Sequence, residues 1–215
     1  MAQLSGLYAI TDTQLLPGEK LSQGVAAAIA GGARVIQYRD KGTDQTRRQQ
    51  EATQLLALCR QHGITFIIND DVALAAEIGA DGVHLGRDDG AIESARQKLP
   101  KGIIGVSCYN DWPRAEMAKS AGADYVAFGA FFPSRTKPNA IAADISLLTR
   151  ARQELNIPVV AIGGITAENG AALIDAGTDM LAVVQGVFGQ PDIRHAAEQY
   201  AQLFNNPIYS VKDAI

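Results

Sequence analysis

The chain has 215 residues, of which 47% are hydrophobic and 20% are charged, and its formal net charge is −4. This is an ordinary globular composition, and the length suffices for one domain with a full core. An acidic chain lacks the general attraction to nucleic acid and anionic lipid that a basic protein has, so neither nucleic acid nor membrane is an expected partner.

Eight apolar runs of strand length recur along the chain, and stretches with helical spacing separate them. The predicted strands are residues 7–10, 34–38, 65–68, 82–85, 103–107, 124–128, 158–162 and 180–184. Short phrases such as Gly79-Ala80-Asp81 and Gly122-Ala123-Asp124 precede several strands and are typical of a helix end that leads into a strand. Continuous apolar strands that alternate with helices predict a parallel sheet buried on both faces.

Eight such units in roughly 200 residues predict an α/β protein of the single (β/α)8 TIM-barrel type. We assign residues 1–204 to the barrel and residues 205–215 to a C-terminal tail. A doubly wound open sheet is the alternative, but it more often has fewer strands. No glycine triplet of the dinucleotide-binding kind opens the helix after the first strand, which argues against a nucleotide-binding fold of that type.

The location of the protein is predicted from two absences. The first ten residues show no basic region followed by an apolar stretch, and no segment approaches the roughly 18 apolar residues of a membrane-spanning helix. We therefore expect a cytoplasmic protein. Cys59 and Cys108 have no metal-ligand spacing and are expected to be reduced thiols.

Functional residues of such a barrel stand at the C-terminal ends of the strands. The second predicted strand ends in Gln37-Tyr38-Arg39-Asp40-Lys41, and the two-residue period of a strand places Gln37, Arg39 and Lys41 on one face. Two cations on one face need an anionic ligand or opposing carboxylates. The alternative is that Arg39 pairs with Asp40 or another nearby acid on a solvated rim.

Acidic residues follow the next two strands, at Asn69-Asp70-Asp71 and at Arg87-Asp88-Asp89. Taken singly, each acid is best interpreted as a cap of the following helix. Taken together, carboxylates from neighbouring strand ends offer the one or two protein ligands that Mg2+ commonly takes beside water and substrate phosphate. With the cations of the second strand opposite, they predict a metal and pyrophosphate site.

The loops after strands six, seven and eight complete the predicted mouth. Residues 131–139 form a loop longer than most βα connections, which indicates a binding loop or lid, or else a mobile surface loop with incidental basic residues. Glycines in residues 163–164 and 184–186 allow backbone N–H groups to approach a phosphate. A pyrophosphate and a phosphate held at one mouth predict a condensation site. His84 is interpreted as a satisfied core group in preference to a catalytic residue.

These motifs resemble those of the thiamine phosphate synthase family along nearly the whole chain. The resemblance is carried by residues 8–12, 37–41, 69–70, 83–86 with Asp89, 105–107, 132–134 with 136–137, and 161–165. It implies a transferase that joins 4-amino-2-methyl-5-hydroxymethylpyrimidine pyrophosphate to 4-methyl-5-(2-phosphooxyethyl)thiazole, with Mg2+ as cofactor and by a dissociative mechanism. Small-molecule substrates are thus the implied partners.

The resemblance also implies a role for each matched residue. The residues implied to hold the pyrophosphate are Arg39, Lys41, Asn69 and Lys137. Gln37 is implied to help hold the pyrimidine, and Ser107 to bond the departing pyrophosphate. The implied Mg2+ ligands are Asp70 and Asp89. Arg39, Lys41, Ser107 and Lys137 are therefore the implied catalytic groups.

The thiazole phosphate is implied to bind at the glycine-rich turns and the loop after strand six. The implied residues are Ser134, Thr136, Gly164, Val184, Gln185 and Gly186. Ser134 stands where many members have Thr, which keeps the hydroxyl. Gln185 stands where many have a Ser that touches this phosphate, so backbone groups are the alternative at that position.

Two rival functions remain open from the sequence. A thiazole tautomerase is a related barrel, but it has no pyrophosphate to hold, and the retained cations and acids argue against it. A non-catalytic barrel that binds thiamine phosphate is the second rival. The outer helices of a barrel can also form a homo-oligomer, although no exposed stripe identifies the face.

Overall fold

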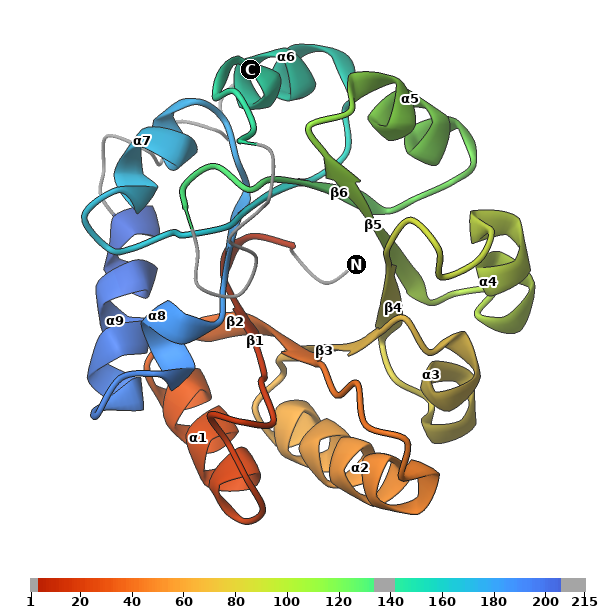
Figure 1. Ribbon diagram of the computed structural model, residues 1–215, viewed down its shortest axis with the longest axis vertical. Helices are drawn as coiled ribbons and strands as arrows, with labels where there is room; N and C mark the ends of the chain where they lie inside the picture. Colours follow the sequence, from red (N-terminus) through yellow and green to blue (C-terminus); the bar gives the residue numbers. More distant parts are fainter. Residues whose placement is uncertain (1–3, 134–141, 206–215) are drawn as a thin grey trace.

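The computed structural model of the protein describes residues 4–133 and 142–205. Its eight strands pair in parallel and in sequence order, and β1 pairs with β8 to close the barrel (Figure 1). The strands are β1 (Gly6–Ile10), β2 (Ala33–Tyr38), β3 (Thr65–Asn69), β4 (Gly82–Leu85), β5 (Ile103–Tyr109), β6 (Tyr125–Phe128), β7 (Val159–Ile162) and β8 (Met180–Val183). The predicted (β/α)8 fold is confirmed, and the open sheet is wrong.

Helices follow the strands and surround the barrel (Figure 1). They are α1 (Lys20–Ala30), α2 (Gln45–Gln61), α3 (Val72–Ile78), α4 (Ile92–Lys98), α5 (Trp112–Ser120), α6 (Ser146–Glu154), α7 (Gly170–Asp175), α8 (Gln185–Phe188) and α9 (Ile193–Phe204). Several begin at an aspartate whose carboxylate accepts a backbone N–H of the first turn, such as Asp111 at α5. Residues 206–215 of the predicted tail lie outside the described residues, so the domain limits stay a prediction.

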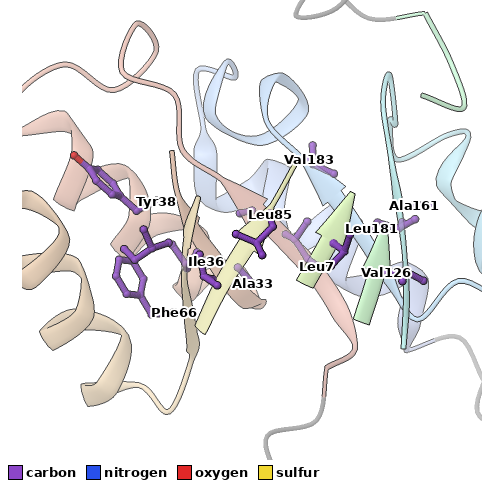
Figure 2. Close-up of a cluster of buried hydrophobic side chains, with 14 of the residues drawn as sticks. Leu7, Ala33, Ile36, Tyr38, Phe66, Leu85, Val126, Ala161, Leu181 and Val183 are labelled. Carbon is purple, nitrogen blue, oxygen red and sulfur yellow. The ribbon is translucent and has the colours of Figure 1, made fainter. Parts of the chain in front are cut away.

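The strands bury both of their faces, as their apolar sequences indicate. Along β1, Leu7 and Ala9 belong to the outer cluster between strands and helices, whereas Tyr8 and Ile10 point into the barrel. Figure 2 shows part of the outer cluster. The inner cluster consists of Tyr8, Ile10, Val35, Ile67, Tyr125, Ala127, Val160, Met180 and Ala182.

Both cysteines are buried and unpaired, in agreement with the predicted reduced thiols. Burial raises the pKa of Cys59 and of Cys108 to about 12, so neither is a thiolate at neutral pH. Within the described ranges, no helix is both long and apolar enough to cross a membrane.

Candidate active site

The C-terminal ends of the strands surround a cavity of about 470 Å3. Predicted site residues that line it are Gln37, Arg39, Asn69, Ser107, Gly164, Val184, Gln185 and Gly186. They come from β2, β3 and β5 and from the segments after β7 and β8, which stand on different sides of the barrel mouth (Figure 1). Closure of the barrel thus brings together side chains and turns that are far apart in the sequence.

Three predicted residues, Lys41, Asp70 and Asp89, do not line the cavity, but Asp70 contacts Asn69, which does. The Lys41 ammonium is hydrogen-bonded to the Asp70 carboxylate, which also accepts the Asn69 amide N–H at 2.6 Å. Asp89 accepts the backbone N–H of Gly86 at 2.7 Å. Ser134, Thr136 and Lys137 were also predicted for the site, and these lie outside the described residues.

Residues 37–40 at the end of β2 alternate as predicted, whereas Lys41, predicted for the same face as Gln37 and Arg39, does not line the cavity. Gln37 and Arg39 face the cavity, whereas Tyr38 and Asp40 face α2, where Arg47 pairs with Asp40. A pair between Arg39 and Asp40 is therefore wrong. The acid near Arg39 is Asp12, whose carboxylate lies 3.9 Å from the guanidinium on the partly exposed rim.

The two acids after β3 differ in their contacts and in their backbone conformation. Asp71 caps α3 by accepting the Leu74 N–H at 2.9 Å, and it pairs with Arg48. Asp70 has a left-handed backbone with a φ of 64°, an uncommon conformation outside glycine that often marks functional positions. The aspartate that caps the helix is thus the second of the pair.

Asp70 and Asp89 are the described residues that fit a divalent cation. Burial raises the pKa of Asp70, Lys41 lowers it, and the adjoining Asp89 carboxylate raises it again, with a net rise. A cation between the two carboxylates would relieve their repulsion. No group of three or more His, Cys, Asp or Glu side chains suited to a metal occurs in residues 4–133 and 142–205. Mg2+ at this pair would take its other ligands from water and phosphate, as it commonly does.

The turn after β7 is built for close approach of the backbone. Gly163 and Gly164 both have positive φ, at 103° and 62°, and a Cβ on Gly164 would lie 2.4 Å from the carbonyl oxygen of Pro133. Only glycine fits there without a shift of the backbone. On the neighbouring segment, the side-chain amide of Gln185 lies against Gly189, where a Cβ would meet it at 2.2 Å.

The sequence interpretation missed a chain of hydrogen bonds at the inner end of the cavity. The Gln37 amide donates to Tyr8 at 2.7 Å, and the hydroxyls of Tyr8 and Tyr125 are 2.8 Å apart. The Tyr125 hydroxyl lies 3.0 Å from Nδ1 of His84, whose Nε2 lies 2.8 Å from Oγ of Ser107. His84 is satisfied, as expected, but it also lines the cavity.

The two-residue period of the strands is the sequence signal that could have identified these hydrogen-bonded residues. Tyr8, His84 and Ser107 stand on the inner faces of their strands, as Gln37 does on β2. Each of these polar residues stands alone in a largely apolar strand, so the sequence did not indicate that they contact one another.

The fold and the site define a class of protein. A closed (β/α)8 barrel, with cations, carboxylates and a glycine turn gathered at one mouth, is typical of enzymes that act on phosphorylated substrates. The model of the family described as thiamine monophosphate synthase matches residues 7–187 of the chain, which belongs to this family.

Individual relatives agree with this assignment. The chain is 56% identical to the thiamine-phosphate synthase of Nitrosococcus oceani, over 94% of each chain. It is 52% identical to the thiamine-phosphate synthase of Thiobacillus denitrificans, over 93% of this chain and 94% of the relative. The solved thiamine phosphate pyrophosphorylase of Pyrococcus furiosus is 35% identical, covers 95% of this chain and 97% of its own, and superposes with a TM-score of 0.86.

The chain is accordingly an enzyme, a transferase with thiamine-phosphate synthase function. This finding favours the synthase over the tautomerase and over the non-catalytic barrel.

Proposed function

We propose that the enzyme joins 4-amino-2-methyl-5-hydroxymethylpyrimidine pyrophosphate to 4-methyl-5-(2-phosphooxyethyl)thiazole and releases pyrophosphate, with Mg2+ as cofactor. The observation that carries the proposal is that residues from different sides of the barrel mouth line one and the same cavity. Arg39 and Asn69 line one part of it, and the turn at Gly163 and Gly164 lines another. One mouth can therefore hold two anionic substrates with their reacting atoms between the anionic groups.

The pyrophosphate is assigned to the side of β2 and β3. Arg39 lines the cavity there, and Lys41 lies beside Asn69 through their shared partner Asp70. Cationic and amide donors stabilise the charge that accumulates on a leaving pyrophosphate. On the family motif, Lys137 and Ser107 are assigned to the same pyrophosphate, and Gln37 is assigned to the pyrimidine.

Asp70 and Asp89 are the proposed Mg2+ ligands. When bound, Mg2+ neutralises developing charge on the pyrophosphate oxygens and so favours its departure. The Lys41 ammonium contacts Asp70. We therefore expect Lys41 and the metal ion to bind the same pyrophosphate.

The thiazole phosphate is assigned to the glycine turn after β7 and the segment after β8. Gly164 and residues 184–186 line the cavity there. Ser134 and Thr136 are assigned to the same phosphate on the family motif. Because the Gln185 amide lies back against Gly189, we assign the contact at this position to backbone N–H groups.

We propose a dissociative reaction. The C–O bond to pyrophosphate breaks with both electrons leaving on oxygen, while the electron-rich aminopyrimidine supports the resulting carbocation. The lone pair of the thiazole nitrogen then forms the new C–N bond. Because this nitrogen carries no proton, the reaction needs no strong general base. The two held substrates gain much of their rate from proximity.

The test supplies the purified enzyme with both substrates and measures thiamine phosphate and pyrophosphate together. We expect equal amounts of the two products, none with either substrate alone, and loss of both on chelation with recovery in excess Mg2+. Isomerisation of a thiazole without pyrophosphate release would favour the tautomerase. Tight binding of thiamine phosphate without turnover would favour the non-catalytic barrel.

A variant tests the proposed role of the strand-six loop in the same assay. Lys137→Ala should lower kcat by roughly 100-fold or more, because one cation at the leaving group is lost. The matched control is Lys101→Ala, since Lys101 is exposed just before β5, at the opposite end of the barrel. Equal activity of the two variants would contradict the role of Lys137.

A further inference from the structure

The hydrogen-bonded chain joins two residues that the proposed function places on the pyrimidine substrate. Gln37 and Ser107 stand at its ends, on β2 and β5. Between them lie Tyr8, Tyr125 and His84, to which the proposed function gives no task. These three belong to β1, β6 and β4, so the chain crosses the inside of the barrel.

The donor and acceptor in each of these hydrogen bonds follow from the protons that each group carries. An amide nitrogen only donates, so the Gln37 amide makes the Tyr8 oxygen an acceptor, and the Tyr125 oxygen is the acceptor within reach of the buried Tyr8 proton. The Tyr125 hydroxyl then donates its hydrogen bond to Nδ1 of His84. With Nδ1 an acceptor, neutral His84 carries its proton on Nε2 and donates it to Oγ of Ser107. The Ser107 proton is left for a ligand.

Burial and ring stacking restrict the movement of the three residues between Gln37 and Ser107. Tyr8 is 1% exposed and Tyr125 is fully buried. Burial, ahead of all other causes, raises the pKa of both phenols, so each keeps its one proton at neutral pH. The His84 ring stacks on the Tyr125 ring at 5.6 Å with an interplanar angle of 21°.

A glycine makes room for the central tyrosine. A Cβ on Gly105 would lie 1.9 Å from Cζ of Tyr125, so the ring fills the space that a side chain on β5 would need. Gly105 and Ser107 stand on the same face of β5, because they are two residues apart. The strand that presents the serine therefore also admits the ring that orients it.

We propose that His84 is a positioning residue, which fixes the Ser107 hydroxyl as a hydrogen-bond donor to the departing pyrophosphate. The inference rests on the proposed role of Ser107. The direction of these hydrogen bonds determines whether Ser107 can donate to the pyrophosphate, because an anion accepts hydrogen bonds and offers none. If the chain ran the other way, Ser107 would donate to His84 and would turn only lone pairs toward the phosphate.

The tautomer of His84 tests the polarity without reference to activity. Nitrogen-15 NMR of the labelled full chain, with His84→Gln to assign the signals, should show a neutral ring protonated on Nε2. A ring protonated on Nδ1, or an imidazolium, at neutral pH would overturn the proposal. Since no substrate is present, this result is independent of the proposed function.

Kinetics test the functional half of the inference. His84→Ala should lower kcat roughly 10- to 100-fold, as expected for a hydrogen bond to a charged group, with an unchanged KM for the thiazole phosphate. His84→Gln should recover most of the loss, because a glutamine amide can donate to Ser107 from near the position of Nε2. Equal losses in the Ala and Gln variants would overturn the role of the Nε2 donor.

A double substitution separates this role from a merely structural one. In a Ser107→Ala background, His84→Ala should cause no further loss of kcat, since its effect passes through the serine. A full additional loss would overturn the proposal. If Ser107→Ala itself left kcat unchanged while the tautomer was as expected, the role of Ser107 in the proposed function would fail, and the functional half of the inference with it. Tyr38→Phe is the folding control, because it removes a buried hydroxyl outside the barrel.

Discussion

Gly105→Ala adds one methyl group at the most crowded point of the barrel interior. The new Cβ would lie 1.9 Å from Cζ of Tyr125 and 2.3 Å from both Cε1 and the hydroxyl oxygen. Carbon atoms in contact normally stay about 3.5 to 4.0 Å apart, so the ring must move by well over 1 Å. The Tyr125 ring is fully buried and has no open side into which it can retreat.

The energetic cost has two parts. Overpacking of a well-filled core typically costs about 1 to 3 kcal/mol. Movement of the ring also strains its hydrogen bonds to Tyr8 and His84, each worth about 1 kcal/mol net. We therefore expect Gly105→Ala to lower the free energy of unfolding by about 3 to 5 kcal/mol, a large share of the usual 5 to 15 kcal/mol.

Urea denaturation followed by the fluorescence of Trp112, the single tryptophan, measures this change. The control is Gly63→Ala, where φ is 65° and no atom lies within 4 Å of the new Cβ, so about 1 kcal/mol of backbone strain is expected. In a Tyr125→Leu background the clashing ring atoms are gone, and the penalty of Gly105→Ala should fall below about 1 kcal/mol. An equal penalty in both backgrounds would refute the assignment of the clash.

Further predictions concern the acids and the glycine turn. Asp71→Ala removes the α3 cap, so it should lower the free energy of unfolding in urea by about 1 kcal/mol without altering the Mg2+ requirement. Asp70→Asn, by contrast, should raise the Mg2+ concentration needed for pyrophosphate release. Burial alone would raise the pKa of Asp40, but a backbone N–H and Arg47 hold it below its ordinary value. Its stabilisation is thus present above about pH 4 and is lost as the pH falls further, so the decline in urea midpoint at acid pH should be smaller in Asp40→Asn. Gly164→Ala should raise the KM for the thiazole phosphate at least about 10-fold, with little change in that for the pyrimidine, because its Cβ would meet Pro133.

The sequence predicted the barrel well because its strands are buried on both faces. Continuous apolar runs located all eight strands to within two residues of their observed ends. The two-residue period at the end of β2 correctly separated Gln37 and Arg39, which face the cavity, from Tyr38 and Asp40, which face α2. Both successes depend on local geometry, which the sequence carries directly.

The division of labour between Asp70 and Asp71 could not be predicted in this way. The two residues are chemically alike and adjacent, so composition and spacing suit either one as a cap. The backbone decides between them, since Asp70 takes a positive φ, whereas Asp71 has a φ of −87° and its carboxylate reaches the Leu74 N–H. Such a choice depends on how β3 leaves the barrel, and no short motif encodes it.

The hydrogen-bonded chain escaped prediction for a different reason. Its central contact joins residues 117 positions apart, and it exists only because the closed barrel points β1 and β6 at one another. Burial of so many polar groups is favourable only when all are satisfied. Within the described part of the chain, the buried side-chain nitrogen and oxygen atoms without a partner are Arg48 Nε and Trp112 Nε1, and neither belongs to this chain of hydrogen bonds. Because an apolar interior of the same volume would leave the Gln37 amide and the Ser107 hydroxyl free to rotate, the polar interior is best explained as the part of the barrel that orients its own active site.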